Sequence, residues 1–219
     1  MTNEALVQKY APVIHFDEKE TIPLSGVGYS ILRETGESPS FSRTVPIKDA
    51  AFVIEYAYYW DYDIQHMYDL EHIWVWVGLD GRVCNAQASF HGKYLNALLN
   101  KGTEKTQLDD EKIHMYCQPG KHAFLPYGEW FELLPDYMDC CMESAGGGLL
   151  VNDMFAGEFE TNINIDKVID SYIKNHLTFK PSMRFVPTCI PDGLYQPWEV
   201  LKQLIPVRIN AELDRLVRA

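Results

Sequence analysis

Acidic and histidine side chains gather in residues 61–72, in the stretch DYDIQHMYDLEH. The apolar run IWVWV follows directly, and its β-branched and aromatic residues favour a strand. Side chains of an extended chain alternate between two faces, so we expect Asp69 and Glu71 on the same face. Two carboxylates that close repel each other unless a proton or a cation lies between them. The spacing is therefore compatible with a cation site, or with a solvated strand end that carries an incidental ion pair.

The cluster contains the ligand types of a hard divalent cation. His66 can fold back onto the two carboxylates if 66–68 forms a turn, and two more aspartates follow the preceding strand. Carboxylate oxygens suit Mg²⁺, Ca²⁺ or Mn²⁺, and one neutral imidazole shifts the preference toward Mn²⁺ or another transition metal. We therefore predict a divalent-cation site, whose candidate ligands are Asp61, Asp63, His66, Asp69 and Glu71.

Two other histidines are candidate catalytic groups because they can approach the same cluster. Asp80-Gly81 predicts a hairpin between HIWVWVGL and RVCNAQASF, which brings His91 back toward the acidic residues. A two-residue loop places His91 opposite Leu70, on the wrong face, whereas a wider loop places it opposite Glu71. His122 follows a later strand, in PGKHAF, and can reach the same end of a sheet. The alternative for each histidine is a purely structural role.

The elements that would position these residues are mainly strands. Strand-like runs include PVIHF at 12–16, AAFVIEYAYYW at 50–60, the two arms of the hairpin, and KIHMYC at 112–117. Helical patterns occupy 3–10, 93–99, 164–177 with Asn164 as N-cap, and 198–217, which we expect to be broken or kinked at Pro206. We predict a mainly β protein with peripheral helices (α+β), formed as a single domain over residues 1–219 around a β-sandwich core.

Composition narrows the classes of partner. The chain has 219 residues and a net charge of −12, which argues against nucleic acid because phosphates require clustered lysine and arginine. No basic segment followed by an apolar one opens the chain, and no apolar run approaches the ~20 residues of a spanning helix. We therefore expect a soluble, cytoplasmic protein. Its five cysteines include one adjacent pair but no C-x-x-C, so we expect reduced thiols.

The acidic cluster resembles the signature of the necrosis- and ethylene-inducing peptide-like (NLP) proteins, in which G-H-R-H-D-W-E runs into an apolar strand. QHMYDLE stands in that place here, and His66, Asp69 and Glu71 match the family's metal-binding His, Asp and Glu. YAYYWDYD is similar to the segment that carries the family's other aspartate, so Asp61 or Asp63 is the counterpart.

Other segments extend the resemblance. ASFHG, with His91, is similar to the family's S-x-H-G, and LLVNDMF is weakly similar to a segment near that family's C-terminus. YAPVIHFDEKETIP and IHMYCQPGKHAF resemble a related family, that of a vacuolar protein sorting-associated protein. The resemblance implies a β-sandwich with a divalent cation at one end, near a surface that binds membrane glycolipid.

Three functions are compatible with this sequence. In the first, a bound Mg²⁺, Ca²⁺ or Mn²⁺ captures a carbohydrate or lipid headgroup, such as a sugar or a phosphate, through its open coordination positions. In the second, the cation serves a hydrolase and activates a water, with His91 or His122 as general base. In the third, the cation only holds a loop in place. The chain contains no recognised nucleophile or nucleotide motif, so we favour binding.

Overall fold

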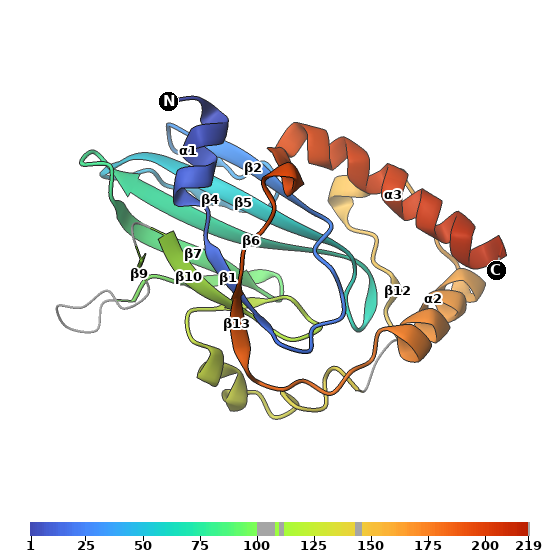
Figure 1. The fold of residues 1–219 in the computed structure, drawn as a ribbon. Coiled ribbons are helices and arrows are strands. Elements are labelled where there is room, and N and C mark those ends of the chain that lie inside the picture. The colour runs from blue at the N-terminus through green and yellow to red at the C-terminus, as the bar shows by residue number, and fades with distance from the viewer. Residues whose placement is uncertain (100–107, 110–111, 143–145, 219) are drawn as a thin grey trace.

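Two β-sheets form the centre of the protein (Figure 1), and the computed structural model describes residues 1–99, 108–109, 112–142 and 146–218. Strands of the larger sheet are β2 (Gly26–Leu32), β5 (Ala50–Tyr62), β6 (His66–Gly78), β7 (Val83–Phe90), β8 (Lys93–Asn96), β12 (Gly148–Leu149) and β14 (Tyr195–Pro197). They are neighbours in the order β14–β2–β5–β6–β7–β8, and β12 pairs in parallel with the start of β6.

The smaller sheet lies against the larger one. It consists of β1 (Val13–Asp17), β9 (Leu108–Asp109), β10 (Lys112–Cys117), β11 (Phe124–Leu125) and β13 (Phe185–Thr188). These strands are ordered β11–β10–β1–β13, and β9 pairs with β10. A separate short hairpin joins β3 (Gly36–Glu37) to β4 (Thr44–Val45).

Aromatic side chains join the two sheets. The ring of Phe124 on β11 packs edge-on against Tyr58 of β5, with their centroids 5.1 Å apart. One continuous buried apolar cluster contains Ile14 from the smaller sheet together with Ile54 and Val75 from the larger sheet. This packing confirms the predicted mainly β fold with a sandwich core.

The apolar run of β6 is buried on both faces. Ile73 and Val75 belong to the core between the sheets, whereas Trp74 and Trp76 belong to a second buried cluster on the opposite face. Phe41 and Ile47, which lie before and after β4, pack in this second cluster. A strand covered on both faces needs continuous rather than alternating hydrophobicity, which explains the sequence IWVWV.

The part of the chain that the structure describes contains three α-helices, which are peripheral as predicted: α1 (Asn3–Tyr10), α2 (Ile163–His176) and α3 (Trp198–Arg218). Short 3₁₀ turns are η1 (Gly128–Leu133), η2 (Asp153–Phe155) and η3 (Asp192–Leu194). Figure 1 shows α2 and α3 together at one end of the larger sheet. Within the described residues, none of the helices is both long and apolar enough to cross a membrane.

Three local expectations differ from the structure. The N-cap of α2 is Asn162 rather than Asn164, because the Asn162 side chain accepts hydrogen bonds from the first turn. Of the break or kink expected at Pro206, the break is wrong, because α3 continues through this residue. Residues 93–96 form strand β8 instead of a helix, since positive φ angles at His91 (50°) and Gly92 (73°) turn the chain back beside β7.

Candidate functional site

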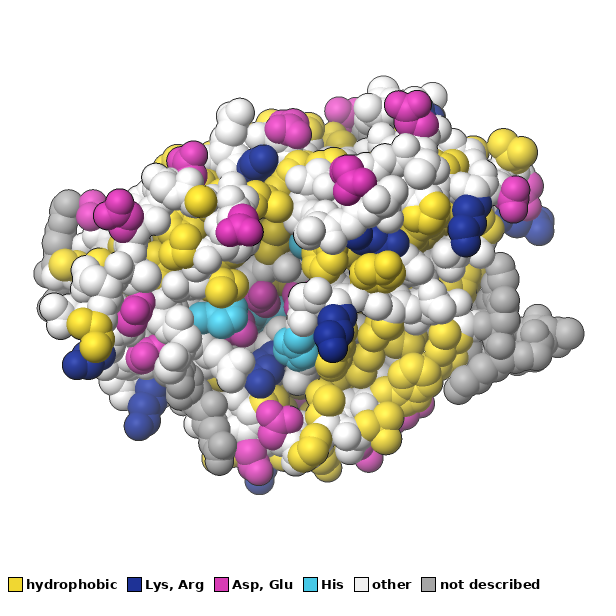
Figure 2. All heavy atoms as spheres, turned by 180° about the vertical axis from the view of Figure 1, so that it is seen from behind, with side chains coloured by type: hydrophobic (Ala, Val, Ile, Leu, Met, Phe, Trp, Pro, Cys, Tyr) yellow, Lys and Arg dark blue, Asp and Glu magenta, His cyan; other side chains and the backbone are white. Residues whose placement is uncertain are grey.

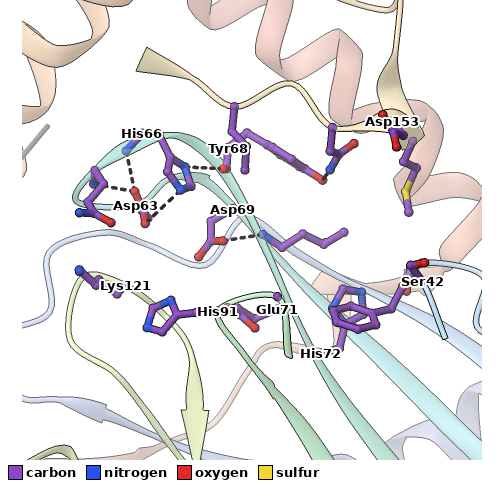
Figure 3. Close-up of a pocket in the computed structure, with 18 residues that line it drawn as sticks. Ser42, Asp63, His66, Tyr68, Asp69, Glu71, His72, His91, Lys121 and Asp153 are labelled. Carbon is purple, nitrogen blue, oxygen red and sulfur yellow. Dashed lines mark hydrogen bonds and ion pairs between the residues drawn. The ribbon is translucent and has the colours of Figure 1, made fainter. Parts of the chain in front are cut away.

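A gap along one edge of β6 forms a pocket. On this edge β12 pairs with His66 and Met67, whereas pairing with β7 begins only at Ile73. No described strand pairs with residues 68–72 of β6 on that edge, and all five line a cavity of about 530 Å³. Figure 2 shows acidic and histidine side chains around a hollow near the middle of one face, and Figure 3 shows the lining residues.

Asp63 lies at the mouth of the turn between β5 and β6. Its Oδ1 accepts hydrogen bonds from the backbone N–H groups of Gln65 and His66, both at 2.6 Å. Its Oδ2 lies 3.5 Å from Nε2 of His66. Burial raises the pKa of Asp63 to about 6, because the opposing effect of His66 is incomplete and the charge of Asp69 adds to the rise. Asp63 is thus a turn-forming residue whose charged form is costly.

Glu71, like Asp63, is almost fully buried, with only 5% of its surface exposed. Its carboxylate accepts a hydrogen bond from the Ser89 hydroxyl of β7. Burial, and then the negative charge of Asp69, raise its pKa well above the usual value, although hydrogen bonds from Ser89 and the His91 backbone N–H oppose the rise. Asp69 and Glu71 therefore face the same pocket from β6, as their spacing predicts.

Asp69 forms a hydrogen bond with His122. Oδ2 of Asp69 lies 3.1 Å from Nδ1 of His122, whose ring is fully buried and stacks on Trp60 with centroids 4.2 Å apart. Burial favours the neutral imidazole, but the hydrogen bond to Asp69 and nearby negative charges outweigh it and raise the pKa of His122. His122 does not line the pocket. It is therefore placed to orient Asp69 rather than to reach a ligand.

His91 does line the pocket, but by a different route from the one expected. The β6–β7 register, extended past Trp76↔Asn85, would place His91 opposite Leu70. β7 ends before this position, and His91 lies in the turn to β8, beside Glu71 (Figure 3). Its Nε2 donates to Oε1 of Gln118 at 2.8 Å. Partial burial lowers the pKa of His91 despite that bond, which favours a neutral imidazole.

The two other ligand candidates are separated by the structure. His66 lines the pocket, and its Nδ1 lies 3.0 Å from the Tyr68 carbonyl oxygen. Asp61 does not line it and instead forms an ion pair with Arg208 of α3, while accepting hydrogen bonds from Ser25 and Tyr59. Of Asp61 and Asp63, the latter is therefore the pocket residue.

Several pocket residues were not expected from the sequence. Lys121 precedes His122 on the loop after β10 and brings a positive charge to the lining. The segment after β12 contributes Asn152, whose side-chain N–H donates to the Tyr68 hydroxyl at 2.9 Å. In the sequence, the weak family similarity of LLVNDMF was the feature that could have indicated this part of the pocket lining. His72 and Ser42 line the far end of the pocket (Figure 3).

Left-handed backbone occurs around the pocket at positions that are not glycine. Tyr68, His91 and His122 have φ angles of 75°, 50° and 59°. Such conformations cost of order 1–3 kcal/mol each and persist where the surroundings over-determine them. Their location supports a functional role for this region, because strained backbone gathers at sites that hold side chains in fixed directions.

The residues fit a hard cation by their chemistry. Four carboxylates, those of Asp63, Asp69, Glu71 and Asp153, line one pocket, and burial and mutual repulsion raise the pKa of Asp63 and Glu71, so their uncompensated charges are unfavourable. Among the described residues, however, no three His, Cys, Asp or Glu side chains are gathered as they stand around a common metal position. The donor set is present, whereas a preformed coordination sphere is not.

Comparisons with known proteins concern the fold. Neither the protein-family models nor the curated proteins give a match to this chain. It is similar to the solved structure "NLPPya in complex with glucosamine", at 15% identity and a TM-score of 0.39, over 76% of this chain and 88% of that one. For "NLPPya in complex with mannosamine" the identity is 16% and the TM-score 0.36, over 80% and 89%.

A third solved structure, "Toxin fold as basis for microbial attack and plant defense", matches at 16% identity and a TM-score of 0.35, over 76% of this chain and 89% of that one. These structures carry the NLP fold, which is the fold that the sequence resemblance names. At such low identities and TM-scores the likeness concerns the fold alone, and the function is argued from the pocket.

Proposed function

We propose that the pocket binds a divalent cation through Asp63, Asp69 and Glu71, and that the cation helps to bind a hydroxyl-rich headgroup. Mg²⁺, Ca²⁺ and Mn²⁺ are the candidate ions, because the ligands would be carboxylate oxygens. When bound, the cation would supply positive charge and coordination positions for ligand oxygens. His66 and His91, at the rim, are further candidate ligands or hydrogen-bond partners.

The single observation that carries this proposal is the convergence of Asp63, Asp69 and Glu71 on one cavity, which Asp153 also lines. Burial raises the pKa of both Asp63 and Glu71, and the charge of Asp69 contributes to each rise. A cation would relieve the same repulsion that a proton relieves. Lys121 also lines the cavity, but its ammonium lies 3.8 Å from Asp136, so its charge is already shared with another carboxylate.

The size and lining of the cavity support a small ligand such as a sugar headgroup. A volume of about 530 Å³ lies within the usual range of roughly 300–1,000 Å³ for small-molecule sites. Polar and charged side chains line the cavity, while Phe41, Leu150 and Met154 add apolar surface. A sugar ring presents both hydroxyl groups and an apolar face. An anionic lipid or phosphate headgroup would meet net negative charge here and would depend more strongly on the cation.

Thermal melting tests the cation part of this proposal. Protein treated with chelator should melt at a higher temperature after addition of at least one of the three cations. At a hundredfold excess over Kd the stabilisation is about 2.7 kcal/mol, or roughly 5–11 °C for a chain of this size. Asp69→Asn should remove this shift.

Asp61→Asn is the matched control, since Asp61 lies two residues from Asp63 but binds Arg208 outside the cavity. It should retain the cation-dependent shift. An unchanged melting temperature of the wild-type protein with all three cations would refute the cation site. A cation shift without any binding of sugars or lipid headgroups would instead assign the cation a structural role.

A hydrolase is the second candidate, and His91 is the observation that favours it. Its ring lines the pocket beside Glu71, and its lowered pKa favours the neutral form needed to accept a proton. His122 is less suited to this role because it is fully buried behind Asp69. Turnover of glycoside or phosphate-ester probes that His91→Asn abolishes would support the hydrolase, whereas binding without turnover would support the binding module.

A further inference from the structure

A pair of adjacent thiols lies directly behind one wall of the pocket. Cys140 and Cys141 are both buried, and their Sγ atoms are 3.7 Å apart. The Cys141 thiol donates to the Pro119 carbonyl oxygen at 3.0 Å, and the Cys140 thiol contacts the Tyr137 carbonyl oxygen at 3.5 Å. The two sulfur atoms therefore face each other as neighbours in both sequence and space.

We propose that Cys140 and Cys141 are a redox-sensitive dithiol, which a hydroperoxide converts reversibly to a disulfide between neighbouring residues. Cys140 is the attacking thiol. Its pKa is lowered, first by its hydrogen bond with Cys141, whose single S–H proton can turn from Pro119 to the Cys140 thiolate, and, against the effect of burial, by the positive charge of Lys121. Because the thiolate is the nucleophile, these surroundings favour Cys140 over the other thiol of the pair.

The position of Cys140 allows a small oxidant to reach it. Only 4% of its surface is exposed, but it follows the exposed residue Asp139 in the chain, and Met142 beyond the pair is 53% exposed. The sulfur is therefore one layer beneath the surface. Hydrogen peroxide is little larger than a water molecule, so small fluctuations of this turn would admit it, whereas larger thiol reagents would react more slowly.

One peroxide molecule oxidises one pair of thiols. The Cys140 thiolate attacks one peroxide oxygen, the O–O bond breaks, and hydroxide leaves to become water, which gives a sulfenic acid on Cys140. The Cys141 sulfur then attacks the Cys140 sulfur. The S–S bond forms, the S–O bond breaks, and the departing hydroxide takes up the Cys141 proton. Two thiols lose two electrons in total, and the peroxide yields two water molecules.

The product should be readily reduced. Cα atoms of neighbouring residues are about 3.8 Å apart across a trans peptide, whereas most disulfides join Cα atoms about 4.4–6.8 Å apart. A disulfide between neighbours is therefore strained, and strained disulfides are the labile and regulatory ones. A cellular or added dithiol would restore the two thiols, so the modification is a switch rather than damage.

Oxidation would reach the pocket through the loop that carries the Cys141 hydrogen bond. Loss of the Cys141 S–H removes the donor to Pro119, and Gly120 next to it accepts a hydrogen bond from the Ile64 N–H at 2.8 Å. Cys141 also packs tightly beneath this turn, since a Cβ at Gly120 would lie 3.2 Å from its sulfur. Movement of the turn would therefore disturb the residue next to Asp63.

The same loop carries three other contacts of the site. Gln118 binds His91, Lys121 lines the cavity, and His122 holds Asp69. Oxidation of the dithiol should therefore alter the pocket without any direct contact between sulfur and ligand. The thiol chemistry itself is independent of the proposed cation and sugar, and only its effect on their binding depends on the proposed function.

Peroxide treatment of the full chain tests the inference. Hydrogen peroxide should lower the number of titratable thiols from the five in the sequence to three, and peptide mapping should find the bond between Cys140 and Cys141. Dithiothreitol should reverse it. Cys141→Ser should stop at the sulfenic acid of Cys140, and Cys140→Ser should block the reaction, whereas Cys189→Ser, at an exposed cysteine, should react like the wild type.

Hydrogen exchange gives a second readout that needs no ligand. The amide proton of Ile64 should exchange faster in the oxidised protein, because its acceptor is the Gly120 carbonyl oxygen. Five remaining thiols, or oxidation confined to the exposed cysteines, would overturn the dithiol site. A disulfide that leaves exchange at Ile64 unchanged would overturn its coupling to the pocket.

Discussion

The substitution Asp63→Asn should stabilise the protein at neutral pH while weakening cation binding. Asp63 is 4% exposed, and its Oδ1 accepts the two backbone hydrogen bonds that shape the turn before β6. An asparagine retains that oxygen and fits the same space. The change therefore removes a costly charge and preserves the local hydrogen bonds.

The magnitude follows from the pKa of Asp63, which burial raises from 3.8 to about 6. An acid whose pKa is raised by folding stabilises the folded protein at pH values below its pKa in the unfolded chain. That stability is lost as the pH rises through its pKa in the folded protein. With 1.36 kcal/mol per pKa unit, the raised pKa of Asp63 lowers the free energy of unfolding by roughly 1 kcal/mol at pH 4.5, where the folded group must take up a proton, and by roughly 3 kcal/mol at pH 7.5, where it is ionised. Asp63→Asn avoids this cost.

Urea unfolding of wild type and variant in the presence of chelator provides the assay. The stability gain of Asp63→Asn should grow by about 2 kcal/mol between pH 4.5 and pH 7.5. At pH 7.5 the melting temperature should rise by roughly 6–12 °C. A gain that does not vary with pH, or a loss of stability at pH 7.5, would refute the assignment of Asp63 as a buried carboxylate with a costly charge.

Three further substitutions test the roles of neighbouring groups. Asp61→Asn should lower the melting temperature through loss of the Arg208 ion pair but leave cation affinity unchanged in calorimetric titration. A weakened cation affinity would show that Asp61 is a cation ligand after all. His122→Phe keeps an aromatic ring but removes the hydrogen bond to Asp69. The raised pKa of His122 stabilises the folded protein below about pH 6.5, and this stability is lost as the pH rises through the pKa of His122 in the folded protein. In the presence of chelator, the free energy of unfolding of the variant should therefore depend less on pH across this transition than that of the wild type. An unchanged pH profile would contradict this. His91→Val should cost about 1–3 kcal/mol in urea unfolding, because a β-branched residue resists a φ of 50°, whereas His91→Asn should cost less than about 1 kcal/mol; equal costs would argue against a backbone origin.

Local sequence patterns predicted the parts of the site that depend on local geometry. The i, i+2 spacing of Asp69 and Glu71 placed both on one face of β6, because alternation in a strand needs no tertiary information. Asp80-Gly81 likewise predicted the β6–β7 hairpin. The mainly β fold followed from the same patterns, since the aromatic and β-branched runs could be read directly.

The remaining features depend on contacts that are distant in sequence or on single-residue irregularities. Asp61 could not be separated from Asp63, because its partner Arg208 lies 147 residues away. His91 was not placed by register, because the strand ends at Phe90 and two left-handed residues form the next turn. The gap along β6 arises where β12 replaces β7, which no pattern within β6 could indicate.

Calorimetric titration with Mg²⁺, Ca²⁺ and Mn²⁺ at pH 6, repeated in two buffers of different ionisation enthalpy, tests the cation site most directly. Burial raises the pKa of Asp63 to about 6, so this group is about half protonated at this pH, and burial also favours the protonated form of Glu71. A cation that binds their oxygens must displace those protons. The account predicts one site per chain for at least one of these ions, with release of protons on binding and a smaller release after Glu71→Gln. Absence of binding by all three ions, or binding without proton release, would contradict it.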